Sequence, residues 1–294
     1  MAQRRLPPAR YRLYTEPERF AQACEMLGVG VPDDDDFRVV PVGDGAPPPD
    51  FEPGRPSAYT GRIAAASVAN AARDALAGAV DAIVTAPLSK AALQLAGVSY
   101  PGHTEYLAAL AGAESVAMMF VADRLRLTLA TIHVPLADVP RAISSSGIET
   151  SVRLTRDALI RYVGIPEPRI AVLGVNPHAG EGGLFGDEEQ RILAPAMAAL
   201  TARGWSVEGP FPADSFFLRR APDFDAVIAM YHDQGLIPVK LLSQGRAVNV
   251  TLGLPFLRTS VDHGTAFDLA GTGRASADSF VEAVDLAVKW TLGA

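Results

Sequence analysis

The chain has little of what disulfide-bonded, membrane-spanning or nucleic-acid-binding proteins need. Its single cysteine, Cys24, excludes an intrachain disulfide and a paired-cysteine metal site, and a role in helix packing is expected for it. No apolar run reaches the roughly 18 residues of a membrane span, and the first residues lack the apolar core of a secretory signal. The net charge of -7 and the pI near 5.3 argue against nucleic acid as a partner, because phosphate binding needs clustered Lys and Arg. We therefore expect a cytoplasmic protein with a small-molecule ligand.

The pattern of apolar residues predicts an α/β fold. A chain of 294 residues is compatible with one large domain or two lobes. Continuous β-prone runs, as expected for strands buried on both faces of a largely parallel sheet, lie at 81–86, 127–132, 169–175 and 225–230. Helix-like spacing is found at about 16–28, 61–79, 87–96, 103–111, 148–163, 187–202 and 276–292. Strand and helix alternate along most of the chain, and Val31 to Gly61 is expected to be a loop rich in Asp, Pro and Gly.

All five histidines lie in short segments dense in Gly, Pro, Asp, Asn and Thr. His133, His178 and His232 sit at or close to the carboxyl ends of strand-like runs, where ligands gather in parallel sheets. Three convergent imidazoles without thiolates suit a catalytic metal site, which keeps a position open for water or substrate. The alternative is that each histidine caps its strand end by bonding to backbone groups.

Charged side chains near the last strand-like run, 247–252, are candidates for anion binding. Lys240 and Arg258, with the polar Asn249 between them, could clamp a phosphate or carboxylate, although exposed cations without a role are commoner. The glycine-rich turn 176–183, followed by a helix start, could likewise hold an anion or could be purely structural.

Two aspartates are candidate proton acceptors. Asp233 follows His232 directly and could accept a proton or orient a ligating imidazole. Asp214 could act in the same way, or could simply be the N-cap of the apolar stretch 215–218.

Neither the GxGxxG dinucleotide fingerprint nor the P-loop pattern occurs in the chain. The segment Asp262-His-Gly-Thr-Ala-Phe-Asp-Leu-Ala-Gly-Thr-Gly273 nevertheless resembles the adenine-binding loop of the isocitrate and isopropylmalate dehydrogenases. This resemblance implies that NAD, or alternatively NADP, is bound without a Rossmann fingerprint. The residues that would contact it are His263, Gly264, Thr265 and Asp268.

Four motifs between Asp81 and Ala294 together resemble the 4-hydroxythreonine-4-phosphate dehydrogenase family of vitamin B6 synthesis. They are Gly102-His-Thr-Glu105, Asn176-Pro-His-Ala-Gly-Glu181, Tyr231-His-Asp-Gln-Gly235 and Gly253-Leu-Pro-Phe-Leu-Arg-Thr-Ser-Val-Asp-His-Gly-Thr-Ala266. The resemblance implies a two-lobed fold like that of the isocitrate and isopropylmalate dehydrogenases. The nucleotide-binding lobe would comprise residues 1–100 and 251–294, and the metal, substrate and dimerisation lobe residues 101–250. A homodimer whose metal ligands come from both subunits is implied as well.

The implied reaction is oxidation of the secondary alcohol of 4-phosphooxy-L-threonine by NAD, giving a β-keto acid that loses CO2 to leave 3-amino-2-oxopropyl phosphate. By motif, the metal ligands would be His133, His178 and His232. Zinc is the expected ion, with magnesium or cobalt as alternatives. The substrate contacts would be His103, Thr104, Lys240, Asn249 and Arg258. Asp214, Asp233 or metal-bound water would accept the proton.

The chain departs from the family pattern at its start. Family members usually open with a strand and a Gly-Pro-rich turn, and nothing similar precedes Tyr11, so a strand, turn and helix of the nucleotide lobe are expected to be missing or built differently. Other members of the family act on threonate or erythronate phosphates or on aromatic dihydrodiol carboxylates. Two functions of other classes stay open, a metal-dependent hydrolase and an inactive binding protein.

Overall fold

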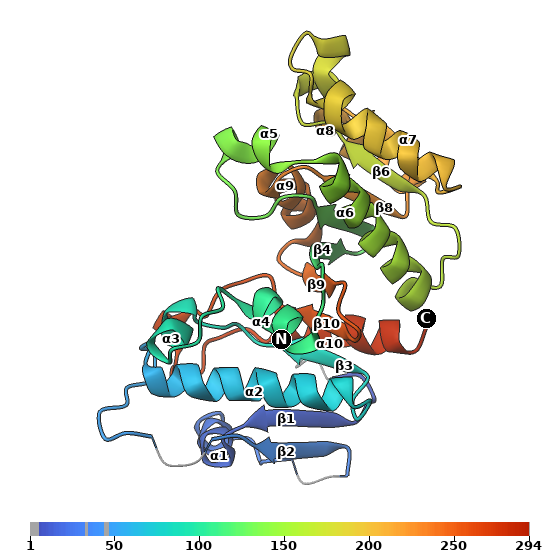
Figure 1. Cartoon of the computed structure of the whole chain (residues 1–294). Helices are drawn as coiled ribbons and strands as arrows, with labels where there is room; N and C mark the ends of the chain where they lie inside the picture. Colours follow the sequence, from blue (N-terminus) through green and yellow to red (C-terminus); the bar gives the residue numbers. More distant parts are fainter. Residues whose placement is uncertain (1–5, 33–34, 44–46, 294) are drawn as a thin grey trace. The chain divides into compact units, whose positions relative to one another are not determined.

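The computed structural model describes residues 6–32, 35–43 and 47–293. Contacts divide the chain into two compact units, the first from residues 1–113 and 254–288 and the second from residues 114–253 and 289–294 (Figure 1). Each unit is therefore built from segments that are distant in sequence. The first residues of the chain, in which no secretory signal is expected, lie partly outside the described residues. None of the described helices is long and apolar enough to cross a membrane.

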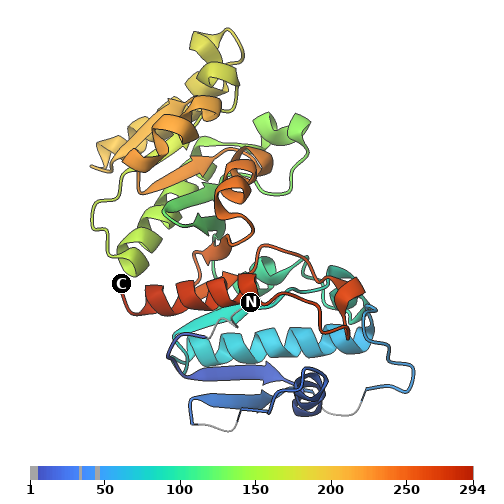
Figure 2. The same ribbon diagram turned by 180° about the vertical axis from the view of Figure 1, so that it is seen from behind.

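The first unit holds two pairs of parallel strands and the helices around them. The pairs are β1 Tyr11–Thr15 with β2 Phe37–Pro41, and β3 Ala82–Thr85 with β10 Leu257–Ser260. The helices are α1 Pro17–Met26, α2 Ala58–Leu76, α3 Lys90–Leu95, α4 His103–Ala111 and α10 Asp278–Thr291. In Figures 1 and 2, α2 is the long central helix of this unit, and it contacts β1, β3, α3 and α4.

Helix α2 forms because its sequence supplies both a start signal and a narrow apolar face. Ser57 accepts a hydrogen bond from the backbone N–H of Thr60, and the Thr60 side chain accepts one from Ser57, which makes a capping box. The buried positions follow helical spacing and are mostly small: Tyr59, Gly61, Ala65, Val68, Ala71, Ala72 and Ala75. Small side chains let neighbouring helices approach closely. At Gly61, an added Cβ would lie 1.9 Å from the Ala92 carbonyl oxygen.

The strands of the second unit follow the order β9-β4-β5-β8-β6-β7. Strands β5, β8, β6 and β7 run parallel to one another, whereas β4 is antiparallel to both β5 and β9. Their bounds are β4 Ala117–Ala122, β5 Leu125–Leu129, β6 Ile170–Leu173, β7 Val207–Phe211, β8 Ala226–Ala229 and β9 Val248–Leu252. The parallel part places the carboxyl ends of β5, β8 and β6 next to one another.

Helices cover both faces of this sheet (Figures 1 and 2). They are α5 Val139–Ala142, α6 Ser145–Ala158, α7 Ala194–Ala202, α8 Ala213–Arg219 and α9 His232–Ser243. Alternate residues of β6 serve different cores: Ile170 and Val172 pack with α5, α6 and α7, while Ala171 and Leu173 pack with α8 and α9. Burial on both faces explains why the run is apolar without interruption.

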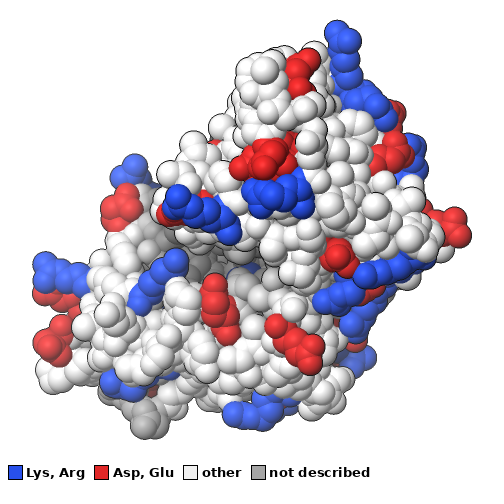
Figure 3. Space-filling model, turned by 45° about the horizontal axis from the view of Figure 1, so that its top comes forward, with Lys and Arg blue, Asp and Glu red and all other residues white. Residues whose placement is uncertain are grey.

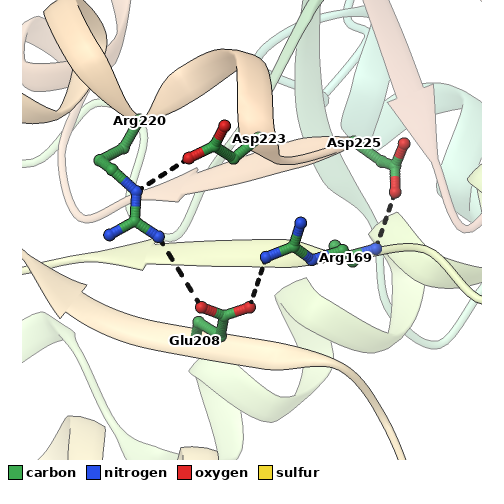
Figure 4. Close-up of polar contacts among 5 residues, drawn as sticks. All are labelled: Arg169, Glu208, Arg220, Asp223 and Asp225. Carbon is green, nitrogen blue, oxygen red and sulfur yellow. Dashed lines mark hydrogen bonds and ion pairs between the residues drawn. The ribbon is translucent and has the colours of Figure 1, made fainter.

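A cluster of ion pairs lies where β6 and β8 begin (Figure 4). Glu208 on β7 accepts from Arg169 at 2.9 Å and lies 3.9 Å from Arg220, which also pairs with Asp223 at 3.0 Å. Asp225 accepts a hydrogen bond from the Arg169 backbone N–H at 2.8 Å. These side chains are largely solvent-exposed, so water and salt screen the pairs and each contributes little to stability. Elsewhere, the face shown in Figure 3 has acidic and basic side chains interspersed.

The structure confirms the α/β fold and each of the four predicted buried strands, which are β3, β5, β6 and β8. The expectation of a largely parallel sheet also holds: β4 runs antiparallel to β5 and β9, because the short turn after Ala122 returns the chain as a hairpin, and the other pairings given for this unit are parallel. One expectation was wrong. The expected loop at 31–61 contains β2 and the start of α2. The β-prone Phe37-Arg-Val-Val did not stand out in the sequence, because the surrounding Asp, Pro and Gly dominate the composition. Cys24 is buried on α1, as predicted.

Gly61→Ala is expected to lower the free energy of unfolding by about 1–3 kcal/mol, the usual cost of overpacking. The new methyl group would meet backbone of α3, which cannot rotate away as a side chain does. Urea denaturation measures the change. Gly30→Ala is the matched control, since a Cβ there meets nothing within 4 Å, and a Gly61→Ala variant as stable as this control would contradict the close approach of α2 and α3.

Candidate active site

Three histidines follow the three adjacent parallel strands of the second unit. His133 comes after β5, His178 after β6, and His232 is the first residue of α9 after β8. The register pairs Leu129 of β5 with Ala229 of β8, so the segments that carry His133 and His232 leave the sheet side by side. Their rings lie together, with centroids 5.8 Å apart and planes inclined by 37°. The His178 ring instead lies 6.1 Å from the ring of Phe185.

Asp233 lies against His232, as the sequence order suggested. One carboxylate oxygen, Oδ1, shares a hydrogen bond of 2.7 Å with His232 Nδ1. A carboxylate at one ring nitrogen favours the tautomer that keeps the other nitrogen, Nε2, as the acceptor. Nε2 of His232 is therefore the atom that would bind a metal or a proton. Both side chains are solvent-exposed, which leaves them open to a ligand.

His178 lies in a turn of unusual handedness. From His178 to Gly182, five successive residues have positive φ angles of 52°, 51°, 82°, 44° and 68°. Glycine adopts this region freely, but His178, Ala179 and Glu181 are strained there because of their Cβ atoms. Such strain persists only where the surrounding structure fixes the backbone.

The surrounding structure supplies a buried carboxylate behind this turn. Glu189 is 4% exposed, and its Oε1 accepts hydrogen bonds of 2.8 Å from the backbone N–H groups of Val175 and Asn176. Its Oε2 accepts from the Asn176 side chain at 3.0 Å. Burial pushes the pKa of Glu189 up, but the hydrogen bonds from Asn176 and Val175 outweigh it and hold the pKa below its ordinary value. Glu189 is thus a charged acceptor within a loop of backbone donors.

Two further side chains join the ends of the histidine-bearing strands. Thr131 donates from its hydroxyl to the Met230 carbonyl at 2.7 Å. Gln234 accepts from the Met230 N–H and donates to the Gly174 carbonyl, both at 2.7 Å. Because Gly174 follows β6 and Met230 follows β8, one amide side chain spans the two strand ends. Sequence reasoning did not single out Thr131, Gln234 or Glu189, although Gln234 lies in the His232-Asp-Gln-Gly235 motif and Glu189 next to the glycine-rich turn.

In the first unit, His103 and Arg258 form a second polar cluster. Arg258 on β10 is 3% exposed and donates from Nε and Nη2 to the Thr85 hydroxyl at 3.1 and 2.7 Å. Burial lowers its pKa to about 10, against the opposing effect of Glu105. Burial, followed by the nearby Arg258 charge, lowers the pKa of His103 to about 3. His103 is therefore neutral at pH 7, while Arg258 keeps its positive charge.

The other predicted substrate contacts are placed as follows. Thr104 is buried in the first turn of α4, and Lys240 is exposed on α9. Asn249 lies on β9, and its buried Oδ1 has no hydrogen-bond partner among the described residues. A buried acceptor without a donor costs about 1–3 kcal/mol, and a ligand that donates to Asn249 would remove this cost.

The expected nucleotide segment follows β10 in the first unit. His263, Gly264 and Asp268 are solvent-exposed, and Thr265 is partly exposed. His263 Nδ1 shares a hydrogen bond of 2.9 Å with the Gly264 carbonyl oxygen. Asp268 lies in the short helix Phe267–Leu269. This exposure leaves the segment accessible to a ligand.

Asp214 is exposed in the first turn of α8. The N-cap of that helix is Pro212, so the alternative interpretation of Asp214 as an N-cap was wrong. Within the described part of the chain, no group of three His, Cys, Asp or Glu side chains is placed to hold a metal ion. The structure thus does not bring the three predicted ligands together: the rings of His133 and His232 are paired, and the ring of His178 lies beside Phe185.

Known proteins of similar sequence are dehydrogenases. The profile of the family described as "Pyridoxal phosphate biosynthetic protein PdxA" matches residues 8–287. The 4-hydroxythreonine-4-phosphate dehydrogenase of Geobacter metallireducens is 54% identical over 82% of this chain and 71% of its own length. The D-threonate 4-phosphate dehydrogenase of Salmonella typhimurium is 48% identical over 83% of this chain and 75% of its own length.

Solved structures agree with the sequences. A 4-hydroxythreonine-4-phosphate dehydrogenase from Klebsiella pneumoniae matches with a TM-score of 0.81 and 44% identity, over 97% of this chain and 84% of that one. A terephthalate 1,2-cis-dihydrodiol dehydrogenase from Burkholderia xenovorans gives a TM-score of 0.67 and 34% identity, over 95% of this chain and 89% of that one. The fold is thus that of an α/β dehydrogenase. The chain belongs to the PdxA family, as its motifs predicted.

The His103 ring is expected to stay neutral from pH 8 down to pH 5, because its pKa is lowered to about 3. NMR titration of the imidazole signals, assigned with His103→Gln, measures this pKa. In Arg258→Gln the midpoint should rise but stay below 6.5, since burial is the larger cause of the shift. A midpoint near 6.5 in the wild type would contradict the buried setting of His103.

Proposed function

We propose that this member of the PdxA family oxidises 4-phosphooxy-L-threonine with NAD, or alternatively NADP, and releases CO2 to give 3-amino-2-oxopropyl phosphate for pyridoxal phosphate synthesis. The observation that carries the proposal is the pairing of the His133 and His232 rings, 5.8 Å apart, in a chain 54% identical to a 4-hydroxythreonine-4-phosphate dehydrogenase. Membership of the family supports dehydrogenase chemistry.

The residues present fit a divalent metal ion in part. The fit rests on neutral nitrogen donors, with His133 and His232 side by side and Asp233 set to orient His232. His178 would complete a three-histidine set, which is typical of catalytic zinc with an open position. When bound, the ion would lower the pKa of the substrate alcohol and polarise the ketone that follows. Zinc suits this donor set best, with magnesium or cobalt as alternatives.

The chain's own side chains would bind the anionic groups of the substrate and move its proton. Arg258 supplies a buried positive charge, and the neutral His103 and the hydroxyl of Thr104 can hydrogen-bond a phosphate or carboxylate. Lys240 and Asn249 would complete the contacts. In the oxidation, hydride leaves the substrate carbon for the nicotinamide, and the hydroxyl proton passes to a base. Asp233 and Asp214 are the candidate bases, and both are solvent-exposed and able to pass the proton to water.

The nucleotide is assigned to the segment after β10. The accessible His263 and Asp268, together with Gly264 and the partly exposed Thr265, would surround the adenosine part. Support comes from the sequence resemblance to adenine-binding loops and from the exposure of the segment.

A homodimer with a shared active site is part of the proposal. On α9, Ile237 and Leu241 are 59% and 74% exposed and one helical turn apart, and Leu242 beside them is 61% exposed. Leu218 on α8 is 80% exposed. Large apolar side chains of this kind favour burial against another subunit. The incomplete histidine set also favours a ligand from a second copy. Location in the cytoplasm stays a prediction from the sequence.

D-threonate 4-phosphate is the second candidate substrate, favoured by the 48% identical Salmonella typhimurium enzyme. It shares the phosphate and secondary alcohol of the first candidate, but it carries a hydroxyl where 4-phosphooxy-L-threonine carries an amino group. Contacts to the anionic groups therefore do not separate the two. An aromatic dihydrodiol carboxylate, suggested by the 34% identical Burkholderia xenovorans enzyme, lacks the phosphate that the His103 and Arg258 cluster would bind.

The deciding measurement follows NADH absorbance with both phosphorylated substrates, with and without added zinc, magnesium or cobalt. We expect the kcat/KM for 4-phosphooxy-L-threonine to be at least about tenfold higher than that for D-threonate 4-phosphate. A tenfold ratio corresponds to a free-energy difference of about 1.4 kcal/mol. A chelator should abolish turnover. Higher efficiency with D-threonate 4-phosphate would reverse the assignment. Metal-dependent phosphate release without NADH would favour a hydrolase, and binding without turnover an inactive binding protein.

His178→Asn tests the metal assignment without breaking the turn, because Asn tolerates positive φ better than most residues. We expect loss of bound metal and a fall in turnover of more than about 100-fold, beyond the loss typical of residues that only support a ligand. Thermal unfolding of the metal-free protein should hardly change. His263→Asn is the control, and it should keep the metal and raise the KM for NAD. Full metal content in His178→Asn would refute His178 as a ligand.

A further inference from the structure

The left-handed turn at 178–182 needs an external restraint. Its three residues with a Cβ occupy a backbone region that costs roughly 1–2 kcal/mol each relative to the right-handed form. Only two glycines, Gly180 and Gly182, lie within these five residues. Local sequence alone therefore favours other conformations of the turn, and contacts from outside it must select the one observed.

The contacts come from Glu189 and from the glycines beside it. Glu189 fixes the backbone just before the turn by accepting hydrogen bonds from the N–H groups of Val175 and Asn176, and it accepts a third from the Asn176 side chain. The turn itself lies directly against Gly174 and Glu189. A Cβ on Gly174 would lie 2.8 Å from Ala179 Cα, and a Cβ on Gly180 would lie 2.7 Å from Glu189 Oε2. The Glu189 carboxylate thus lies directly behind Gly180 in the turn and behind the backbone that leads into it.

We propose that Glu189 is a positioning residue of the active site, which holds the turn that carries His178 in the left-handed conformation observed. This inference rests on the proposed function for the role of His178, but the restraint on the turn stands on the contacts alone. Glu189 touches neither substrate nor reacting atoms in this assignment. It acts through Asn176 and the backbone around it, two residues before His178.

A carboxylate is needed at this position, and an amide is not equivalent. Both oxygens of Glu189 receive N–H donors, and a buried carboxylate presents acceptors only. In Glu189→Gln, Oε1 can still accept the two backbone N–H groups. The new NH2 group, however, faces the Asn176 side-chain NH2, and two donors then oppose each other. The Gln variant should therefore loosen the turn without removing the bulk behind it.

Glu188→Gln is a matched control. Glu188 precedes Glu189, accepts from the same Asn176 side chain at 2.7 Å, and loses the same charge when changed to Gln. Within the described residues its hydrogen bond is to the Asn176 side chain and not to the backbone of the turn, and Glu188 is only partly buried. Gly174→Ala is a second test variant, which pushes on Ala179 from behind without altering any charge.

The experiment measures amide hydrogen exchange at Val175 and Asn176, the affinity for Co²⁺ by its visible absorption, and kcat and KM, in the full-length protein. In Glu189→Gln and Gly174→Ala we expect faster exchange at these amides, Co²⁺ binding weaker by about tenfold or more, and a lower kcat with little change in KM. Glu188→Gln should match the wild type in all three. Thermal unfolding identifies any variant that fails to fold. Gln is used at position 189 because it keeps the shape of the side chain and so disturbs folding least.

Wild-type exchange, Co²⁺ affinity and kcat in Glu189→Gln would overturn the proposal. Equal losses in Glu188→Gln would also overturn it, since they would trace to the charge or to the Asn176 side chain, which both glutamates share, and not to the backbone hydrogen bonds of Glu189. If the wild type itself binds no Co²⁺, the metal assignment fails separately. Exchange and kcat then decide the role of Glu189, with slowed turnover and faster exchange supporting it and unchanged values refuting it.

Discussion

The parallel pairing of β5, β8 and β6 is the constraint on which the rest of the second unit depends. Parallel hydrogen bonding brings the carboxyl ends of the three strands to one edge, and their burial on both faces fixes the register. A slip of one residue would exchange the two apolar cores that Ile170 and Ala171 serve. It would also move each histidine to a different depth at the edge. The position of the candidate site thus follows from core packing.

Each unit keeps one buried charged side chain near its candidate site, and the two are stabilised differently. Glu189 is surrounded by N–H donors, which hold its pKa low in spite of burial. Arg258 donates to a neutral hydroxyl, and burial lowers its pKa. The negative charge is therefore satisfied by the protein backbone and serves structure. The positive charge sits beside a neutral histidine, an environment that suits an incoming anion.

The sequence allowed the prediction of those features that have a local signal. Continuous apolar runs identified β3, β5, β6 and β8, and helical spacing identified α2 and α6 to within a few residues. The histidines were found because their positions relative to the strand ends can be counted. β2 was missed, since Asp, Pro and Gly around it dominate the composition. The hairpin that makes β4 antiparallel turns at Asp123, which has a φ of 57°, and one aspartate is too weak a signal to predict it.

The roles of Glu189 and Gln234 needed coordinates. A glutamate in the first turn of a helix is ordinary in sequence, and only the structure shows that its carboxylate is buried against Val175 and Asn176. Gln234 likewise bridges Met230 and Gly174, which are 56 residues apart. Contacts over such distances leave no periodic trace in one sequence. Assignments of metal, nucleotide and substrate residues stay predictions on which the proposed experiments bear.

The strained turn at 178–182 and the sheet behind it should respond differently to heat. The left-handed turn stores backbone strain, while the sheet behind it is buried in an apolar core. Local opening of the turn therefore requires less free energy than unfolding of the sheet, because it breaks a few hydrogen bonds and releases strain at the same time. On warming, the protein would lose the alignment of His178 while its secondary structure is still intact. Inactivation and denaturation would then be two separate events, with the first one reversible on cooling.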